Sequence, residues 1–392
     1  MTRRFIAAGF GLLALLPGCV ASIAPRSSYR ATVIVSFAAD GSESVRATGI
    51  ADPATRRRVA ADDPVRIASI SKLVTALGVM RLAEAGTLSL DRDVSDWLGW
   101  RLRNPAFPDA PVTLRMLLSH QSSLTDGADY VIPLGETLEQ RLRDPRAWDT
   151  DHRPGSYFRY TNLNFPVVAS VMEKATGERF DRLMTRLVFD PLKIDACMNW
   201  TGCSGAAIAR AVVLTDAEGN VRRDDLKGNR PTCPVVPAAD GSCDLSAYQP
   251  GTNGALFSPQ GGVRISMRDL GKIGAVILRG GDGFLSAQSI AALIGPEWRF
   301  DGTNGDTEKG FNCTYGLAVQ TLSTARPGCK DDPFGDGKPR IGHAGEAYGL
   351  RSGLWLDRDR KRGIAFFTTA IPDDAPSGRS AFTTAEEIIL RR

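Results

Sequence analysis

Residues that commonly bind metal ions are scarce in this chain. Its 392 residues include three histidines, His120, His152 and His343, and seven cysteines, no two of which lie two to four residues apart. Zinc sites usually show closely spaced cysteine or histidine pairs in the sequence. We therefore expect no metal site, and nothing in the sequence indicates a cofactor.

Long apolar runs and blocks of like charge are also missing. A mean hydropathy of -0.14 excludes a polytopic membrane protein, since each spanning helix needs about 20 apolar residues. The 48 basic residues, only nine of them lysine, nearly balance 44 acidic residues, which offers no basic surface for nucleic acid. Hydrophobic and charged contents of 43% and 23% exclude a disordered or fibrous chain.

The N-terminus has the pattern of a processing signal. Arg3 and Arg4 precede an uncharged run over 5–16 that is too short to span a membrane, and Leu16-Pro17-Gly18-Cys19 follows. This sequence resembles the bacterial lipobox, after which cleavage leaves an acylated cysteine. We predict a signal peptide over 1–18, lipidation of Cys19 and a tether over 19–28, with an ordinary secretory signal as the alternative. The predicted location is the bacterial cell envelope, membrane-anchored and facing the periplasm or the exterior.

Six cysteines remain once Cys19 is set aside. An even number suits disulfide bonds in an oxidising compartment, although six cysteines permit fifteen connectivities. Loop length favours pairing between sequence neighbours as a hypothesis. The neighbours are Cys197 with Cys203, Cys233 with Cys243, and Cys313 with Cys329.

Hydrophobic patterns predict strands at both ends of the chain and helices between them. The runs 29–37 and 43–51 flank a turn and indicate a β-hairpin. Further strands are expected over 315–321, 350–357 and 363–369. Helices are expected over 72–85, 112–118, 163–175, 267–278, 286–294 and 381–390.

This order of elements predicts an α/β fold of the α+β type. An antiparallel sheet is built from N- and C-terminal strands and flanked by helices, beside a central, mostly helical subdomain and a cleft at their junction. We expect one domain over 29–392, with its α/β part at about 29–85 and 310–392 and its helical part at about 86–309. Residues 197–261, rich in Gly and Pro, are interpreted as a disulfide-pinned surface excursion.

Ser69-Ile70-Ser71-Lys72 is an S-x-x-K motif at the start of a predicted helix. Residues three apart share one helix face, so Lys72 can reach the Ser69 hydroxyl. A desolvated lysine with a lowered pKa can help to remove the proton of a hydroxyl that is otherwise a poor nucleophile. The helix N-terminus adds a backbone N–H for a developing oxyanion. The motif is common by chance, so it needs further support.

Two later segments supply that support. Residues 154–162 contain Tyr160-Thr161-Asn162, a Y-x-N element just before a helix, and His343-Ala344-Gly345 precedes the C-terminal strands. Serine acyl-transferases of one type carry S-x-x-K, then an S-D-N element, then K-T-G. The same order holds here, with Y-x-N in second place and H-x-G in third.

Four blocks, at 66–72, 117–124, 154–162 and 342–349, resemble the β-lactamase-related serine hydrolases. That family includes class C β-lactamases, D-amino-acid carboxypeptidases and bacterial carboxylesterases, and the resemblance extends from about 66 to 367. It implies a β-lactamase/transpeptidase-like fold and hydrolysis of an ester, amide or D-amino-acid peptide through an acyl-enzyme. Hydrolysis of β-lactams and non-catalytic binding of penicillin or peptidoglycan fragments remain alternatives.

The same resemblance implies roles for three catalytic residues. Ser69 would be the acylated nucleophile, and Lys72 and Tyr160 would form the proton-transfer pair. A tyrosine, whose unperturbed pKa is about 10, needs a cation beside it to act as a base near neutrality. The resemblance therefore implies a Tyr160 phenolate stabilised by the Lys72 ammonium.

The resemblance also implies the substrate-binding residues. Asn162 would hold the acyl-side amide, and the oxyanion hole would be the backbone N–H groups of Ser69 and Glu346, the residue after His343-Ala344-Gly345. His343 replaces the lysine typical of true β-lactamases and resembles the esterase and D-peptidase branches. Glu346 puts an acid where small or polar residues are commoner. Both departures favour an esterase or peptidase over a β-lactamase.

His120 is a competing candidate for a catalytic base. It follows an apolar helical turn, and the chain has no G-x-S-x-G, the nucleophile motif of the α/β-hydrolases. We interpret His120 as a structural residue at a helix end and His152 as a loop residue. We expect a monomer that takes a small-molecule or peptide substrate, binds no nucleic acid and meets the membrane through its lipid anchor.

Overall fold

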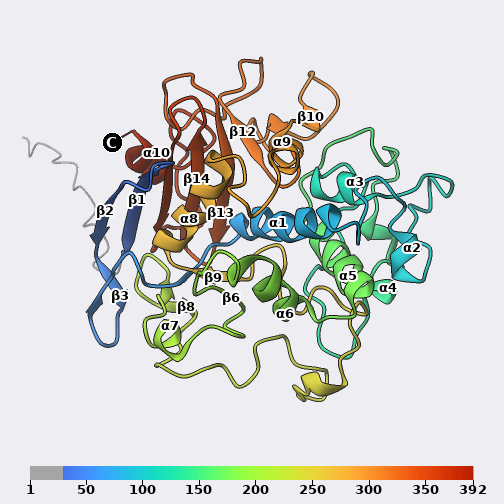
Figure 1. Ribbon diagram of the computed structural model, residues 1–392, viewed down its shortest axis with the longest axis horizontal. Coiled ribbons are helices and arrows are strands. Elements are labelled where there is room, and N and C mark those ends of the chain that lie inside the picture. Colours follow the sequence, from blue (N-terminus) through green and yellow to red (C-terminus); the bar gives the residue numbers. More distant parts are fainter. Residues whose placement is uncertain (1–29, 392) are drawn as a thin grey trace, which may run out of the picture.

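The computed structural model describes residues 30–391, and an antiparallel sheet of eight strands forms one side of it, on the left in Figure 1. The order is β10-β11-β12-β13-β14-β15-β1-β2. Because β1 pairs with β15, strands from the two ends of the chain are neighbours, as the sequence predicts. The strands are β1 Thr32–Ala38, β2 Glu43–Thr48, β10 Trp298–Arg299, β11 Thr314–Tyr315, β12 Gln320–Leu322, β13 Arg340–Ala347, β14 Leu350–Asp357 and β15 Arg362–Thr368.

Backbone constraints explain where the strands depart from the predicted ranges. The run 43–51 breaks after β2 because Gly49 has φ +96°, and a Cβ there would collide with the Arg30 carbonyl. The run 315–321 is divided between β11 and β12 by a turn in which Ala318 has φ +56°. The strand β13 is not predicted at all, because its glycines favour no strand by themselves. It forms by pairing with β12 and β14 on its two sides.

The helices of the sheet layers agree with the predicted ranges to within a few residues. Helix α10 begins later than predicted because Thr383 and Glu386 form a capping box that sets its first turn. These helices are α1 Ile70–Glu84, α8 Met267–Leu278, α9 Ala287–Ile294 and α10 Thr384–Leu390.

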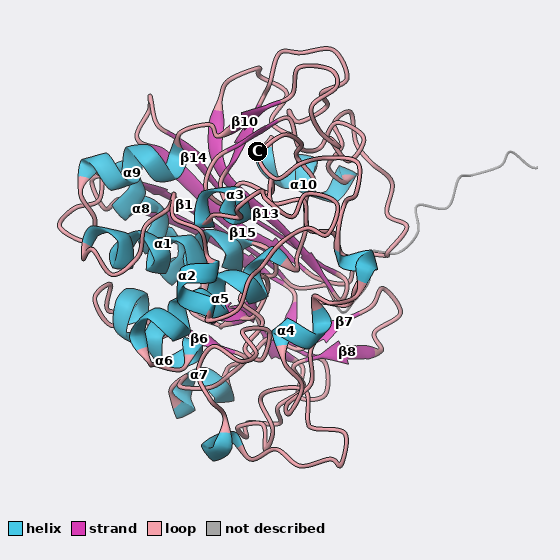
Figure 2. Ribbon diagram, turned by 90° about the vertical axis from the view of Figure 1, so that its right-hand side faces the viewer, coloured by secondary structure: helices cyan, strands magenta, loops and turns pink. Residues whose placement is uncertain are grey.

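Both faces of the sheet are covered (Figure 2). Because side chains alternate across a strand, Leu354 of β14 packs in the main core with α1 and α8, whereas its neighbour Trp355 packs with Phe382 and α10 on the opposite face. This burial on both faces explains the consecutive apolar residues at 354–356 in β14 and 364–367 in β15.

Helix α1 lies between the sheet and a helical part of the chain (Figure 1). Twelve of its fifteen residues are buried, so α1 belongs to the core of both parts, and its N-terminus opens at their junction. The helical part contains α2 Ser95–Leu98, α3 Leu114–Leu118, α4 Leu138–Arg141, α5 Asn164–Thr176, α6 Phe180–Met184, the π-helical turn Thr185–Phe189 and the 3-10 turn Pro145–Ala147.

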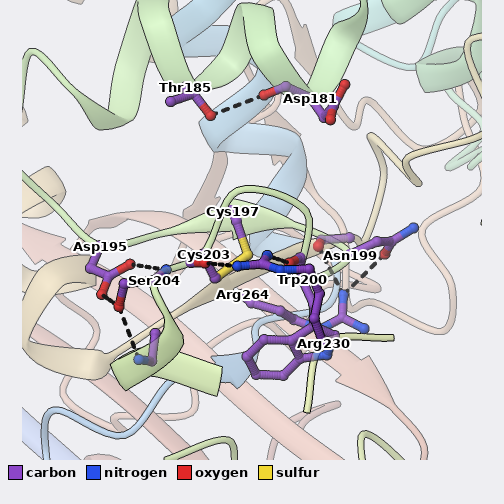
Figure 3. Close-up of a disulfide and its surroundings, with 12 residues drawn as sticks. Asp181, Thr185, Asp195, Cys197, Asn199, Trp200, Cys203, Ser204, Arg230 and Arg264 are labelled. Carbon is purple, nitrogen blue, oxygen red and sulfur yellow. Dashed lines mark hydrogen bonds between the residues drawn. A yellow bond between two sulfur atoms is a disulfide. The ribbon is translucent and has the colours of Figure 1, made fainter. Parts of the chain in front are cut away.

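The segment 197–261 is only partly a surface excursion. Its first strand joins a small sheet in the order β5-β9-β6, and Trp200 and Leu214 are buried. The predicted neighbour pairs are the three disulfides of the structure, and Figure 3 shows the Cys197–Cys203 bond at the root of the segment. The remaining elements are β3 Ile50–Asp52, β4 Arg57–Arg58, β5 Val65–Arg66, β6 Cys197–Met198, α7 Gly205–Ala209, β7 Leu214–Thr215, β8 Val221–Arg223, the 3-10 turn Leu245–Ala247 and β9 Val263–Ile265.

The predicted signal peptide over 1–18, Cys19 and the tether over 19–28 lie outside the described residues. Within 30–391, no helix has the length and apolar character that crossing a membrane requires. In the same part of the chain, no group of His, Cys, Asp and Glu side chains is arranged to hold a metal ion.

Candidate active site

Ser69 occupies the N-cap position of α1, with helical backbone angles (φ -64°, ψ -12°). A serine here usually accepts a hydrogen bond from the first helical turn, but in the described structure the Ser69 side chain makes no such bond. The Lys72 ammonium instead donates to the Ser69 Oγ over 2.9 Å. The S-x-x-K spacing therefore places the hydroxyl and the amine in contact, as predicted.

Lys72 is fully buried, with 0% of its surface exposed. Besides Ser69, its Nζ donates to the Asn162 Oδ1 at 2.8 Å and to the Gln260 carbonyl at 3.3 Å, so all three of its donors are used. Burial lowers the pKa of Lys72 to about 7. A substantial fraction of the amine is thus unprotonated near neutrality, as a general base requires.

Two carboxylates limit how far that pKa falls. The charges of Asp126 and Glu308 raise the pKa of Lys72 against the effect of burial. Asp126 accepts hydrogen bonds from the backbone N–H groups of Asn162 and Leu163 and from the Asn162 Nδ2, at 2.9 to 3.0 Å. With Nδ2 held in this way, Oδ1 of Asn162 faces Lys72. The sequence analysis missed Asp126, whose only signal was its place two residues after the 117–124 block.

Tyr160 lies beside the same amine. The Lys72 Nζ is 4.8 Å from the centroid of the Tyr160 ring. Burial raises the pKa of Tyr160 above its ordinary value, against the opposing effect of a hydrogen bond with Ser69. The phenol is therefore the protonated partner of the pair, which differs from the phenolate that the family resemblance implies.

His120 is buried behind this pair. Its Nδ1 accepts a hydrogen bond from the Thr161 N–H at 3.0 Å and lies 3.2 Å from the Asn164 Nδ2. Its ring stacks on Tyr160 with centroids 4.4 Å apart. Burial holds the pKa of His120 well below its ordinary value. A neutral imidazole with these contacts positions the Y-x-N segment. His152 bonds to Asp149 instead, at 2.9 Å.

His343 is also neutral and buried, with 1% of its surface exposed. Its Nδ1 donates to the Ala344 carbonyl at 2.6 Å, which leaves Nε2 to accept from the Tyr315 hydroxyl at 2.8 Å. Burial, and then the charge of Lys72, lower its pKa to about 3. His343 therefore presents no positive charge to a substrate carboxylate.

Gly345 lets β13 approach the turn that carries the nucleophile. A Cβ at this position would collide with the Ile67 carbonyl and with the Ser352 hydroxyl, which itself donates to the Ile67 carbonyl at 3.1 Å. Any other residue would push the strand away from Ser69. This close approach explains the third position of the H-x-G motif.

Glu346 contributes its backbone N–H to the cleft. The Ala344 N–H donates to the Gln320 Oε1 of β12, and N–H groups two residues apart point to the same edge of a strand. Since β12 pairs with β13 only as far as Gly342 in the described sheet, the Glu346 N–H at this edge faces the cleft. The exposed carboxylate of Glu346 pairs with Arg351 at 2.6 Å.

These residues line one cleft of about 1290 Å³. It extends along β13 between the sheet, the N-terminus of α1, the Y-x-N segment and the segment 197–261, which supplies one wall. The predicted residues Ser69, Tyr160, Asn162, Gly345 and Glu346 all line it, and the fully buried Lys72 lies directly behind Ser69 and Asn162.

The fold therefore brings a buried amine and a phenol together beside the Ser69 hydroxyl at one cleft. A family model described as Beta-lactamase matches residues 23–384. The chain belongs to this family, which confirms the resemblance seen in the sequence.

Among curated proteins, the chain is similar to the D-alanyl-D-alanine-carboxypeptidase/endopeptidase AmpH of Escherichia coli K12, at 30% identity over 159 residues, covering 39% of this chain and 41% of that protein. It is also similar to the esterase EstB of Burkholderia gladioli, at 34% identity over 167 residues, covering 39% and 42%. These matches therefore span about two fifths of the relatives' length.

Solved structures share the fold. D-amino acid amidase from Ochrobactrum anthropi SV3 superposes with a TM-score of 0.65 at 18% identity, covering 92% of each chain. The octameric penicillin-binding protein homologue from Pyrococcus abyssi gives a TM-score of 0.65 at 20% identity, covering 92% of this chain and 73% of that one. The predicted fold class is thereby confirmed.

Proposed function

We propose that the protein is a serine hydrolase that acts through an acyl-enzyme on an ester, amide or D-amino-acid peptide. The observation that carries the proposal is the buried Lys72 amine, 2.9 Å from the Ser69 hydroxyl and with a pKa lowered by burial to about 7. The names of the relatives, an esterase and a D-alanyl-D-alanine carboxypeptidase, support the same substrate classes.

Acylation begins with the transfer of the Ser69 proton to the unprotonated Lys72. The Ser69 Oγ bonds to the substrate carbonyl carbon, and the resulting oxyanion accepts hydrogen bonds from the backbone N–H groups of Ser69 and Glu346. The bond from carbon to the leaving oxygen or nitrogen then breaks. The leaving group takes a proton from the Tyr160 hydroxyl, which regains one from Lys72, so the alcohol or amine departs neutral.

Deacylation repeats these steps with water. Lys72 and Tyr160 accept the proton of a water that attacks the acyl carbon, and the Ser69 Oγ leaves and recovers a proton from the same pair. The products are the free carboxylic acid and the starting enzyme. No cofactor enters this sequence of steps.

A panel of substrates tests the proposal. We expect turnover of a p-nitrophenyl ester, a D-amino acid amide or a D-alanyl-D-alanine peptide, and modification of the Ser69 peptide by a fluorophosphonate, located by mass spectrometry. A chromogenic cephalosporin should turn over slowly, because the neutral His343 offers no cation to its carboxylate. Cephalosporin turnover faster than every ester and amide would favour β-lactam hydrolysis. Fluorophosphonate or penicillin labelling without any turnover would favour a binding protein.

We further propose that the protein is a lipoprotein of the bacterial cell envelope, anchored through Cys19. The motif Leu16-Pro17-Gly18-Cys19 and the complete pairing of the other six cysteines support this location, since disulfides persist in oxidising compartments.

Replacing the lipobox cysteine tests the anchor. Cys19→Ser should abolish labelling by a radioactive fatty acid and move the protein from the membrane to the soluble fraction, while Ser28→Ala, in the same segment, should change neither. Fatty-acid labelling that survives in Cys19→Ser would show that this cysteine carries no lipid.

A further inference from the structure

The end of the cleft beside the β13–β14 hairpin carries an unusual pair of cations. Tyr348, in the turn between the strands, has φ +52° and is 39% exposed. The guanidinium of Arg66 lies 5.3 Å from the centroid of its ring, and that of Arg223 lies 5.4 Å away. Like charges repel unless something compensates them, so this arrangement calls for nearby negative charge.

Arg66 is a buried cation that the described chain satisfies only in part. It is 7% exposed; its Nη1 donates to the Gly261 carbonyl at 2.8 Å, and its Nε finds no hydrogen-bond partner within residues 30–391. Burial, and then the charge of Arg264, lower its pKa to about 9, although Asp224 acts in the opposite direction. Arg66 lines the cleft three residues before Ser69. Its positive charge is only partly neutralised, so the side chain can bind an anion in the cleft.

The Asp224 carboxylate, which offsets part of the positive charge at this end of the cleft, already accepts hydrogen bonds from other side chains. Asp224 accepts from the Arg264 Nη2 at 2.9 Å and from the Trp200 indole at 2.9 Å, whereas it is 3.9 Å from the Arg66 Nε. Figure 3 shows Arg264 and Trp200 side by side at the root of this wall.

The other carboxylates lining this end of the cleft have partners of their own. Asp225 pairs with Lys227 and Asp373 with Arg222, each at 3.9 Å. Asp126, which does not line the cleft, accepts two hydrogen bonds from Asn162. Glu346, two residues before Tyr348, pairs with Arg351 at 2.6 Å. Within the described residues, Asp224 pairs with both Arg66 and Arg264, and the nearby Arg223, whose charge lowers the pKa of Arg66, adds a third positive charge around this one carboxylate.

This end of the cleft lies on the acyl side of the reaction. Tyr160, which protonates the leaving group in the proposed mechanism, lies towards His343, with ring centroids 6.1 Å apart. Tyr348 is five residues further along the chain, roughly 16 Å away along the direction of β13. A substrate whose carbonyl lies at Ser69 and Glu346 therefore extends its acyl chain towards Tyr348.

We propose that Arg66 and Arg223, which both lie against the Tyr348 ring, form a subsite for a carboxylate carried by the acyl portion of the substrate. The planar guanidinium groups suit a carboxylate, which they can bind through paired hydrogen bonds. The inference rests on the proposed serine hydrolase function and narrows its substrates to acyl groups with a free acid at the far end.

Two esters of equal chain length test this subsite. The p-nitrophenyl monoester of adipate and p-nitrophenyl hexanoate differ chiefly in the terminal carboxylate. The wild-type protein should prefer the adipate ester in kcat/KM at low salt, and the preference should shrink as salt screens the charges. Arg223→Gln should lower the adipate-to-hexanoate ratio by about tenfold. Arg358→Gln, which changes an exposed arginine that does not line the cleft, should leave the ratio unchanged.

Three results would overturn the subsite: no preference for the adipate ester, an unchanged ratio in Arg223→Gln, or an equal fall in Arg358→Gln. Absence of turnover of both esters would instead be a failure of the proposed function. In that event, calorimetric titration with adipate decides the subsite by itself. Binding by the wild-type protein that weakens in Arg223→Gln supports it, and a lack of binding contradicts it.

Discussion

Ser69→Ala is expected to abolish turnover and all covalent labelling by a fluorophosphonate or a penicillin probe. The substitution removes the only atom that bonds to the substrate in the proposed mechanism, so the loss in kcat should be at least on the order of 10³-fold. Stability should hardly change, because the Ser69 hydroxyl does not cap α1 in the described structure. Labelling is measured by mass spectrometry and stability by thermal unfolding.

Ser71→Ala is the matched control, with the opposite pattern. Ser71 is fully buried, and its hydroxyl accepts from the Val263 N–H at 3.1 Å. Its loss leaves a buried donor unpaired, which costs about 1–3 kcal/mol of unfolding free energy, yet labelling should persist. A folded Ser71→Ala protein without labelling, or a labelled Ser69→Ala protein, would assign the nucleophile elsewhere.

Lys72→Ala and Tyr160→Phe should each lower kcat/KM for acylation by about 10²–10⁴-fold, the usual value of general acid–base catalysis. The double variant should be little slower than the slower single one, because residues that act as one unit are not additive. Since Lys72 also bonds to Asn162 and Gln260, each variant is compared by thermal unfolding first. Full activity in Tyr160→Phe, together with complete loss in His120→Ala, would show that a different relay operates.

The pH dependence provides a second readout of Lys72. Only the unprotonated amine accepts the Ser69 proton, so kcat/KM should be low at acid pH and rise with a midpoint near 7, the pKa to which burial lowers this group. His120 and His343, whose pKa values burial depresses much further, do not account for a rise there. Burial raises the pKa of Glu308 to about 7, so this group titrates in the same range and its charge raises the pKa of Lys72 as it ionises. Glu308→Gln removes this second titration and should move the midpoint to lower pH. A flat profile between pH 5 and 9 would contradict Lys72 as the base.

Local patterns in the sequence were enough for the parts of the site that lie close together in the chain. The pairing of Ser69 with Lys72 follows from the helical repeat, because residues three apart share a face. The strands β14 and β15 follow from the short apolar runs 354–356 and 364–367 on either side of a polar turn, and α8 follows from its helical periodicity. The order of the three motifs was also readable, and it placed the chain in the correct family.

Tertiary packing determined the long-range contacts and the protonation states of the site. Lys72 meets Asn162 across 90 positions and Gln260 across 188, and no local pattern specifies such contacts. Burial decides that Lys72 is near its titration point, that Tyr160 keeps its proton and that His343 is neutral, although the sequence suggested a phenolate at Tyr160.

At the acyl end of the cleft, too, the tertiary structure brings together residues that the sequence did not connect. Arg66, Arg223 and Tyr348 come from three distant segments. Arg66 and Tyr348 lie in the blocks 66–72 and 342–349, whereas Arg223 had no signal in the sequence. The sequence by itself determined the family, through the order of its motifs, and the contact between Ser69 and Lys72, because helix geometry depends on near neighbours. Only the tertiary structure decided the protonation states and the shape of the cleft, because desolvation and charge depend on everything packed around a group.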